Sequence, residues 1–179
     1  MLTYKLCGHI CKNELSGYKR TFIFTYLHFQ FDSMDVSDAM TPNPISCSTE
    51  KPLSHVSELM IKHDIGSVII HRNETPTGIV TKTDIVCAVY EEERPISNIS
   101  IDVAMTTPLI TIEKTRGIQT AIKLMNDESV KKLVVVDELD VIGIVTMEDI
   151  VSNYNRVKSA AFELAKMEFE NTESENRQF

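Results

Sequence analysis

The sequence predicts an α/β (α+β) fold, in which two copies of one β-α-β-β-α unit pack as a pseudo-two-fold pair, followed by a C-terminal helix. The first observation is an internal repeat: residues 39–41 (AMT) recur as 104–106, and residues 78–86 (GIVTKTDIV) return in related form as 143–151. Both matches have the same offset of 65 positions, so the repeat runs without a gap. The second observation is that short β-branched runs alternate with amphipathic helical patterns in each copy, which is typical of α/β folds. Because a repeat defines the unit of folding, we expect two equivalent halves.

Each copy begins with a short extended piece and an amphipathic helix. The extended pieces are residues 45–47 and 110–112. The helices that follow have apolar residues at helical spacing, which predicts one buried face on each. These residues are Leu53, Val56, Leu59 and Met60 in the first copy, and Ile118, Ala121, Ile122, Leu124 and Met125 in the second.

Two strands and a second helix complete each copy. The runs at 67–70 and 133–136 are too short for buried helices and rich in β-branched residues, which predicts buried strands. Turn-forming residues follow at 72–77 and 137–140. The Gly-Ile-Val-Thr sequence that comes next in each copy predicts a second strand that leads directly into a helix.

The ends of the chain lie outside the repeat. Residues 1–33 have no counterpart in the second copy, and Met34 stands just before the repeat. Two interpretations stay open: an extension from a misassigned start codon, or a genuine extra strand. We expect the first repeat over 34–95, the second over 96–152, and a helix with a frayed polar tail over 153–179.

Composition argues against several classes of protein. The chain is 42% hydrophobic and 25% charged, as is usual for a globular protein. Its net charge of −8 argues against a nucleic-acid partner, because non-specific affinity for phosphates comes from Lys and Arg. No apolar run approaches the roughly 20 residues that span a bilayer, so we expect no membrane association. The four cysteines lack the density of a disulfide framework, which predicts a cytoplasmic location.

The sequence offers no convincing metal or catalytic site. Cys7 and Cys11 are spaced like part of a zinc knuckle, but structural zinc takes four ligands and a second Cys/His pair is absent from the sequence. A nucleophile, a base and an orienting group cannot be assembled at sensible positions. We therefore expect a protein that is not an enzyme, with no metal and no cofactor.

A Thr-x-x-Asp motif lies at the strand-to-helix junction of each copy, as Thr81/Asp84 and Thr146/Asp149. One interpretation is a capping pair that satisfies the first amides of the helix. The other is a site for a phosphorylated sugar. The Thr hydroxyl and the helix amides could receive a phosphate, and the carboxylate could accept both hydrogen bonds of a ribose diol. The spacing alone leaves both interpretations open.

Taken together, these features resemble a tandem pair of CBS (cystathionine β-synthase) domains, often called a Bateman module. The resemblance covers residues 35–151 and includes both ends of both copies. It implies a stand-alone CBS-domain protein that binds an adenine nucleotide or adenosyl ligand, of the AMP, ADP, ATP or S-adenosylmethionine class, in clefts between the copies. It also implies a regulatory role without catalysis, a homodimer and a regulated protein that the sequence does not name.

The resemblance implies two ligand sites, each built from both copies. Site A comprises Ile79, Thr81, Thr83, Asp84, Pro108, Leu109, Ile110, Val130 and Lys132. Site B comprises Asn43, Pro44, Ile45, Ile65, Ser67, Ile144, Thr146 and Asp149.

The two sites are expected to differ in charge. Lys131 and Lys132 match the family's basic pair before the strand, whereas the corresponding first-copy residues are uncharged. Lys82 lies beside site A and Glu148 beside site B. We therefore expect site A to hold a nucleotide phosphate, and site B to be empty or to hold a less charged adenosyl ligand.

Three alternative functions stay open. The chain could be a trans-acting regulator related to the CBS modules of inosine monophosphate dehydrogenase, although a barrel of about 250 residues does not fit within it. It could be a CBS-containing transcriptional regulator, but its acidic charge and lack of a basic recognition helix count against this. It could also be a structural dimer whose clefts have lost their ligand.

Overall fold

The computed structural model describes residues 34–156 and 159, so residues 1–33 and most of the predicted C-terminal tail lie outside the described part. Both repeats belong to one compact unit, Asp35–Ile150. A helix begins at Met147 and continues through Arg156, so the predicted C-terminal helix is present as far as it is described. Of the described helices, none is both long and apolar enough to cross a membrane.

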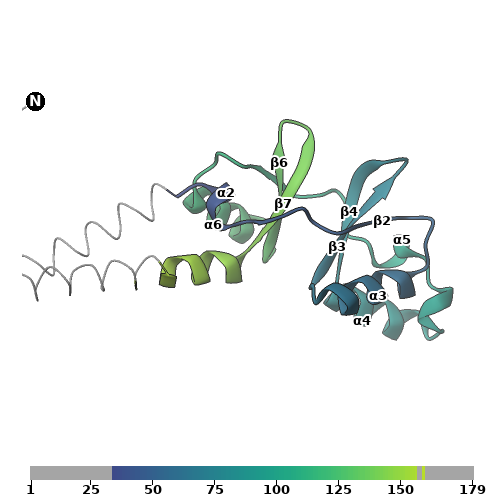
Figure 1. Ribbon diagram of the computed structural model, residues 1–179. Coiled ribbons are helices and arrows are strands. Elements are labelled where there is room, and N and C mark those ends of the chain that lie inside the picture. Colours follow the sequence, from purple (N-terminus) through teal and green to yellow (C-terminus); the bar gives the residue numbers. More distant parts are fainter. Residues whose placement is uncertain (1–33, 157–158, 160–179) are drawn as a thin grey trace, which may run out of the picture. The chain divides into compact units, whose positions relative to one another are not determined.

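The first repeat has the predicted β-α-β-β-α order (Figure 1). Its elements are β2 (Ser46–Ser48), α3 (Leu53–His63), β3 (Ser67–Arg72), β4 (Thr75–Thr81) and α4 (Lys82–Glu92). Strand β2 pairs parallel with β3, and β3 pairs antiparallel with β4. The β3–β4 hairpin turns through Asn73 and Glu74, which both have a positive φ, as a tight hairpin turn requires.

The second repeat follows the same order. Its elements are β5 (Thr111–Glu113), α6 (Ile118–Asp127), β6 (Lys132–Asp137), β7 (Asp140–Thr146) and the helix over residues 147–156. Strand β5 pairs parallel with β6, and β6 pairs antiparallel with β7. The prediction of two equivalent halves is therefore confirmed.

Short elements precede each repeat, and the sequence analysis did not predict them. They are α2 (Val36–Ala39) and β1 (Thr41–Pro42) before β2, and the 3-10 helix η1 (Ile96–Asn98) and α5 (Ile101–Ala104) before β5. All are only two to four residues long. Elements of this length leave too little periodicity to be read from sequence.

The two repeats interlock by exchanging these leading segments. Strand β1 pairs antiparallel with β7 of the other repeat, with Thr41 opposite Ile144. Equivalently, Thr106 bridges Ile79 on β4 through two backbone hydrogen bonds of 2.9 and 3.1 Å. These pairings are related by the same offset of 65 positions as the sequence repeat. The result is one sheet in the order β1-β7-β6-β5 and another in the order β2-β3-β4.

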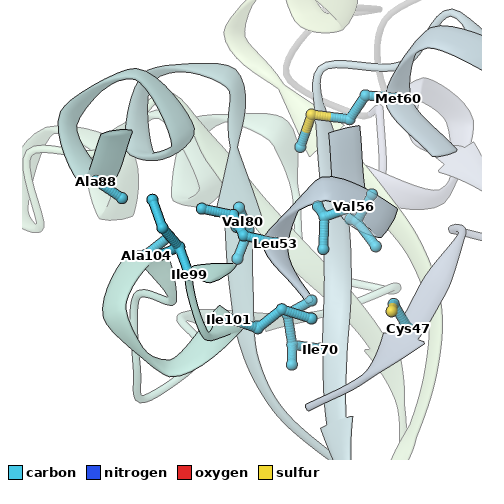
Figure 2. Close-up of a cluster of buried hydrophobic side chains, with 11 residues drawn as sticks. Cys47, Leu53, Val56, Met60, Ile70, Val80, Ala88, Ile99, Ile101 and Ala104 are labelled. Atoms are coloured by element: carbon cyan, nitrogen blue, oxygen red, sulfur yellow. The ribbon is translucent and has the colours of Figure 1, made fainter. Parts of the chain in front are cut away.

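The core of the first repeat lies between its sheet and its helices. Helices α3 and α4 lie beside each other and contact the three-stranded sheet (Figure 1). The predicted face of α3 is confirmed, since Leu53, Val56 and Met60 are buried. Figure 2 shows them gathered with Ile70 and Val80 of the sheet. This packing fixes the ends of β3 and β4, and it therefore positions the junction that carries Thr81.

Candidate functional site

The junction between β4 and α4 is held by a reciprocal capping box. The Thr81 amide and hydroxyl both donate to Oδ2 of Asp84, at 2.7 Å each. In return, the Asp84 amide donates to Oγ1 of Thr81 at 3.3 Å. The capping interpretation is therefore confirmed for the first copy.

The second copy has the same box. The Thr146 amide and hydroxyl donate to Oδ2 of Asp149 at 2.9 and 2.7 Å, and the Asp149 amide donates to Thr146 Oγ1 at 3.1 Å. A hydroxyl and a carboxylate are thus placed in one geometry at both junctions. Capping is compatible with ligand binding, because the capping hydrogen bonds hold both side chains in the rotamers that a ligand would contact.

The capping box leaves part of the first junction available to a ligand. The amide of Lys82 donates to the Gly66 carbonyl at 3.3 Å, so most of the first amides of α4 are engaged. Within the described part of the chain, the amide of Thr83 and Oδ1 of Asp84 have no hydrogen-bond partner. One amide donor and one carboxylate oxygen of residues that line the cavity at this junction are therefore available to a ligand. This arrangement suits a hydroxyl-bearing sugar better than a phosphate held by several helix amides.

Cleft A is a cavity of about 460 Å³ at this junction. Eight of the nine residues predicted for site A line it, and Leu109 does not. Four further lining residues, Gly66, Thr106, Ser129 and Val134, were not predicted from the sequence. Lys82 and Lys131, which were predicted to lie beside the site, line it as well. Thr106 belongs to the repeated Ala-Met-Thr segment, so the repeat could have identified it.

Cleft B is a cavity of about 690 Å³ at the equivalent junction of the second repeat. All eight residues predicted for site B line it. Met147 and Glu148, which the sequence placed beside the site, line it as well. The lining residues outside the prediction are Thr41, Asp64, Gly66, Lys131 and Lys132. Both cavities lie within the range of about 300–1,000 Å³ that is usual for small-molecule sites.

The charges of the two clefts differ, but less simply than predicted. Lys82 lines only cleft A, whereas Asp64 and Glu148 line only cleft B. Lys131 and Lys132 line both clefts. The resemblance placed Lys132 in site A alone and its uncharged first-copy counterpart, Ser67, in site B. The structure places Lys132 where the two clefts adjoin.

The Lys132 ammonium lies near Gly66 of the first repeat. A Cβ atom added to Gly66 would be 4.0 Å from Lys132 Nζ, which is an ordinary contact distance, so the ammonium lies close to Gly66 without crowding it. Burial lowers the pKa of Lys132 below its ordinary value. Asp84 opposes this shift, Lys82 adds to it, and Asp149 opposes it. The two opposing carboxylates belong to the two different clefts.

The described residues contain no cluster of three or more His, Cys, Asp or Glu side chains that could hold a metal ion. The Cys7 and Cys11 pair lies outside the described part of the chain. The chemistry that the clefts offer is therefore that of hydroxyl, carboxylate and ammonium groups, which bind a ligand by hydrogen bonds and charge.

Comparisons with known proteins give the same fold. Among curated proteins, the chain is 34% identical over 122 residues to uncharacterized protein MK0525 of Methanopyrus kandleri, covering 66% of this chain and 62% of that one. It is 34% identical over 117 residues to a homoserine O-acetyltransferase of Methanocorpusculum labreanum, covering 64% of this chain but 23% of the enzyme. The chain thus spans less than two thirds of the length of either relative.

A solved structure extends the comparison. The CBS domain pair of protein MJ0100, in complex with 5′-methylthioadenosine and S-adenosyl-L-methionine, is 26% identical with a TM-score of 0.61. The match covers 68% of this chain and 99% of that pair. The family model for the CBS domain matches residues 36–91 and 99–156, which include both capping boxes. The chain therefore belongs to the CBS domain family, with two CBS domains in tandem.

Proposed function

We propose that the protein is a non-catalytic regulatory module that binds adenine nucleotides or related adenosyl ligands in clefts A and B. The observation that carries the proposal is the pairing of a Thr–Asp box from one repeat with apolar residues from the other around each cavity. In cleft A, Oδ1 of Asp84 is not used by the capping box and can accept from a ribose diol. Ile79, Pro108 and Ile110 give an apolar wall that suits a flat adenine ring.

The comparison with MJ0100 supports this ligand class. Its CBS domain pair is in complex with two adenosyl compounds, and the match covers 99% of that pair and 68% of this chain. The match to a homoserine O-acetyltransferase covers 23% of that enzyme, which fits a module separable from a catalytic domain. An exposed free thiol at Cys87 is compatible with the proposed cytoplasmic location, where thiols stay reduced.

Within this class we assign phosphate-bearing ligands preferentially to cleft A. Lys82 adds a cation that cleft B lacks, and charge-assisted hydrogen bonds to phosphate are among the stronger ones in proteins. Cleft B has Asp64 and Glu148 in its wall, which would repel a phosphate. A less charged adenosyl ligand fits cleft B better.

Calorimetric titration of the full chain tests the proposal. The panel comprises AMP, ADP, ATP, S-adenosylmethionine and 5′-methylthioadenosine. We expect at least one to bind, and Asp84→Asn to weaken binding in cleft A because the amide loses the carboxylate's second strong acceptor. Asp127→Asn is the matched control, since Asp127 ends α6 and lines neither cleft. If no member of the panel binds the wild type, the proposal fails and a structural role is favoured.

We further propose that the module acts as a homodimer. Helix α4 exposes Val86 and Tyr90, whose exposed fractions are 68% and 83%. The equivalent position of the second repeat exposes Val151, at 51%. Apolar side chains at matching positions of two pseudo-symmetric helices suit an isologous contact. Sedimentation should therefore show a dimer that Tyr90→Lys weakens, while Leu139→Lys, at an exposed hairpin turn, leaves it intact.

A further inference from the structure

Clefts A and B are adjoining cavities with a common wall. Gly66, Lys131 and Lys132 line both of them, whereas every other charged lining residue belongs to one cleft only. Lys132 begins β6 and pairs in register with Thr146, the capping residue at cleft B. Its Nζ atom lies 4.0 Å from the position that a Cβ would take on Gly66, which precedes β3 of the other repeat. One side chain thus extends from the cleft B junction toward the first repeat.

The electrostatic surroundings of Lys132 come from both clefts. Asp84 of cleft A and Asp149 of cleft B both favour its charged form, and Lys82 of cleft A disfavours it. Lys132 is also half-buried, so its charge is less screened by solvent than that of the exposed Lys131. A change of charge in either cleft therefore acts on the same ammonium.

We propose that Lys132 couples the two clefts, so that a phosphate-bearing nucleotide bound in one cleft weakens the binding of a second phosphate in the other. This inference rests on the proposed function. A single ammonium has three donors but one position, and a phosphate in cleft A draws it toward Lys82 and Asp84. Cleft B then keeps Lys131 against Asp64, Glu148 and Asp149. By linkage, a phosphate in cleft B weakens cleft A by the same factor.

The coupling depends on the ligand's charge. 5′-Methylthioadenosine has the adenine and ribose groups but no phosphate, so it has no anionic group to bind the Lys132 ammonium. Two molecules of it should fill the clefts independently. AMP should show a coupling of about 5- to 150-fold, the range usual for coupled sites.

Methyl NMR on the full chain can follow each cleft separately. Isoleucine methyl groups report on cleft A through Ile79 and Ile110, and on cleft B through Ile45, Ile65 and Ile144. Titration with AMP should give a cleft B curve that is weakened as cleft A fills. In Lys132→Met the coupling should fall to about twofold or less. Lys82→Met is the matched control, because it removes a lysine from cleft A alone and should weaken AMP there while the coupling persists.

The outcomes separate the coupling from the proposed function. Independent AMP curves in the wild type would overturn the coupling while leaving ligand binding intact. So would a coupling that survives unchanged in Lys132→Met, or a cleft B that excludes AMP equally in the wild type and in Lys132→Met. Equal coupling for AMP and 5′-methylthioadenosine would also overturn it, since charge would then play no part. Binding of neither ligand would instead reject the proposed function itself.

Discussion

The interlock between the repeats depends on two glycines, and replacing them should have unequal effects. Gly78 on β4 and Gly143 on β7 are both buried, and each faces the methionine of the other repeat's Ala-Met-Thr segment. A Cβ at Gly78 would lie 2.4 Å from Met105 Cγ and 2.7 Å from the Thr106 carbonyl oxygen. A Cβ at Gly143 would lie 2.6 Å from Met40 Sδ, but 3.1 Å from the nearest backbone oxygen. The first clash involves backbone and the second mainly a flexible side-chain end.

The magnitude follows from which neighbour can move. Neither glycine has a positive φ, so alanine is penalised only by crowding. Overpacking lowers the free energy of unfolding by about 1–3 kcal/mol, whereas replacing glycine with alanine raises it by about 0.4–1 kcal/mol, because alanine restricts the unfolded chain. The Thr106 carbonyl is held by a hydrogen bond from Ile79, so Gly78→Ala should lose about 2 kcal/mol. At Gly143 the thioether can turn away, which leaves a net loss of about 1 kcal/mol or less.

Urea unfolding of the two variants and the wild type measures these losses. A paired Met→Ala change at each site supplies the control: Met40→Ala should relieve most of the Gly143→Ala penalty. Met105→Ala should relieve less of the Gly78→Ala penalty, because the Thr106 oxygen remains. A Gly78→Ala variant as stable as the wild type, or less destabilised than Gly143→Ala, would refute the close approach of the repeats at β4.

Four further outcomes are expected. Asp84→Ala should lower AMP affinity about tenfold more than Asp149→Ala in calorimetry, because Lys82 serves cleft A alone; equal losses would contradict the assignment of phosphate to cleft A. Thr81→Val should destabilise the protein by about 1 kcal/mol in urea, the usual worth of a cap, and an unchanged midpoint would show that the box is dispensable. Folding lowers the pKa of Lys132 below its ordinary value of 10.5, so between these two pKa values the unfolded chain binds more protons than the folded one. The free energy of unfolding should therefore rise with pH over that range, and Lys132→Met should flatten this rise. A bound phosphate favours the ammonium, so over the same range AMP affinity should fall with pH and binding should take up protons, which calorimetry in two buffers detects.

Much of the fold could be predicted because its elements have local signals. The helical spacing of Leu53, Val56 and Met60 shows directly as the buried face of α3. Leu59, which shares that pattern, is only partly buried, because it lies at the edge of the face. The β-branched runs predicted β3 and β6, and the structure extends both by two residues.

The exchange of leading segments could not be predicted in the same way. Strand β1 has two residues, and its partner on β7 lies about a hundred positions further along the chain. Pairing between strands so far apart in sequence is decided by tertiary packing, and local hydrophobic periodicity does not indicate which strands will pair. The same holds for Leu109, which neighbours Pro108 and Ile110 in sequence but does not line the cleft that they line.

The position of Lys132 shows why a charge difference between repeats need not stay within one cleft. The interlock brings Gly66 and Lys132, which precede or begin equivalent strands, to the same wall. If both copies carried a lysine at the position of Lys132, two ammonium groups would meet there and repel each other at short range. Ser67 in the first copy avoids this, and the cations common to both clefts, Lys131 and Lys132, come from the second copy alone. In such a pseudo-two-fold pair, a lysine present in only one copy can therefore contribute charge to one cleft and also make the other cleft respond to a phosphate bound there.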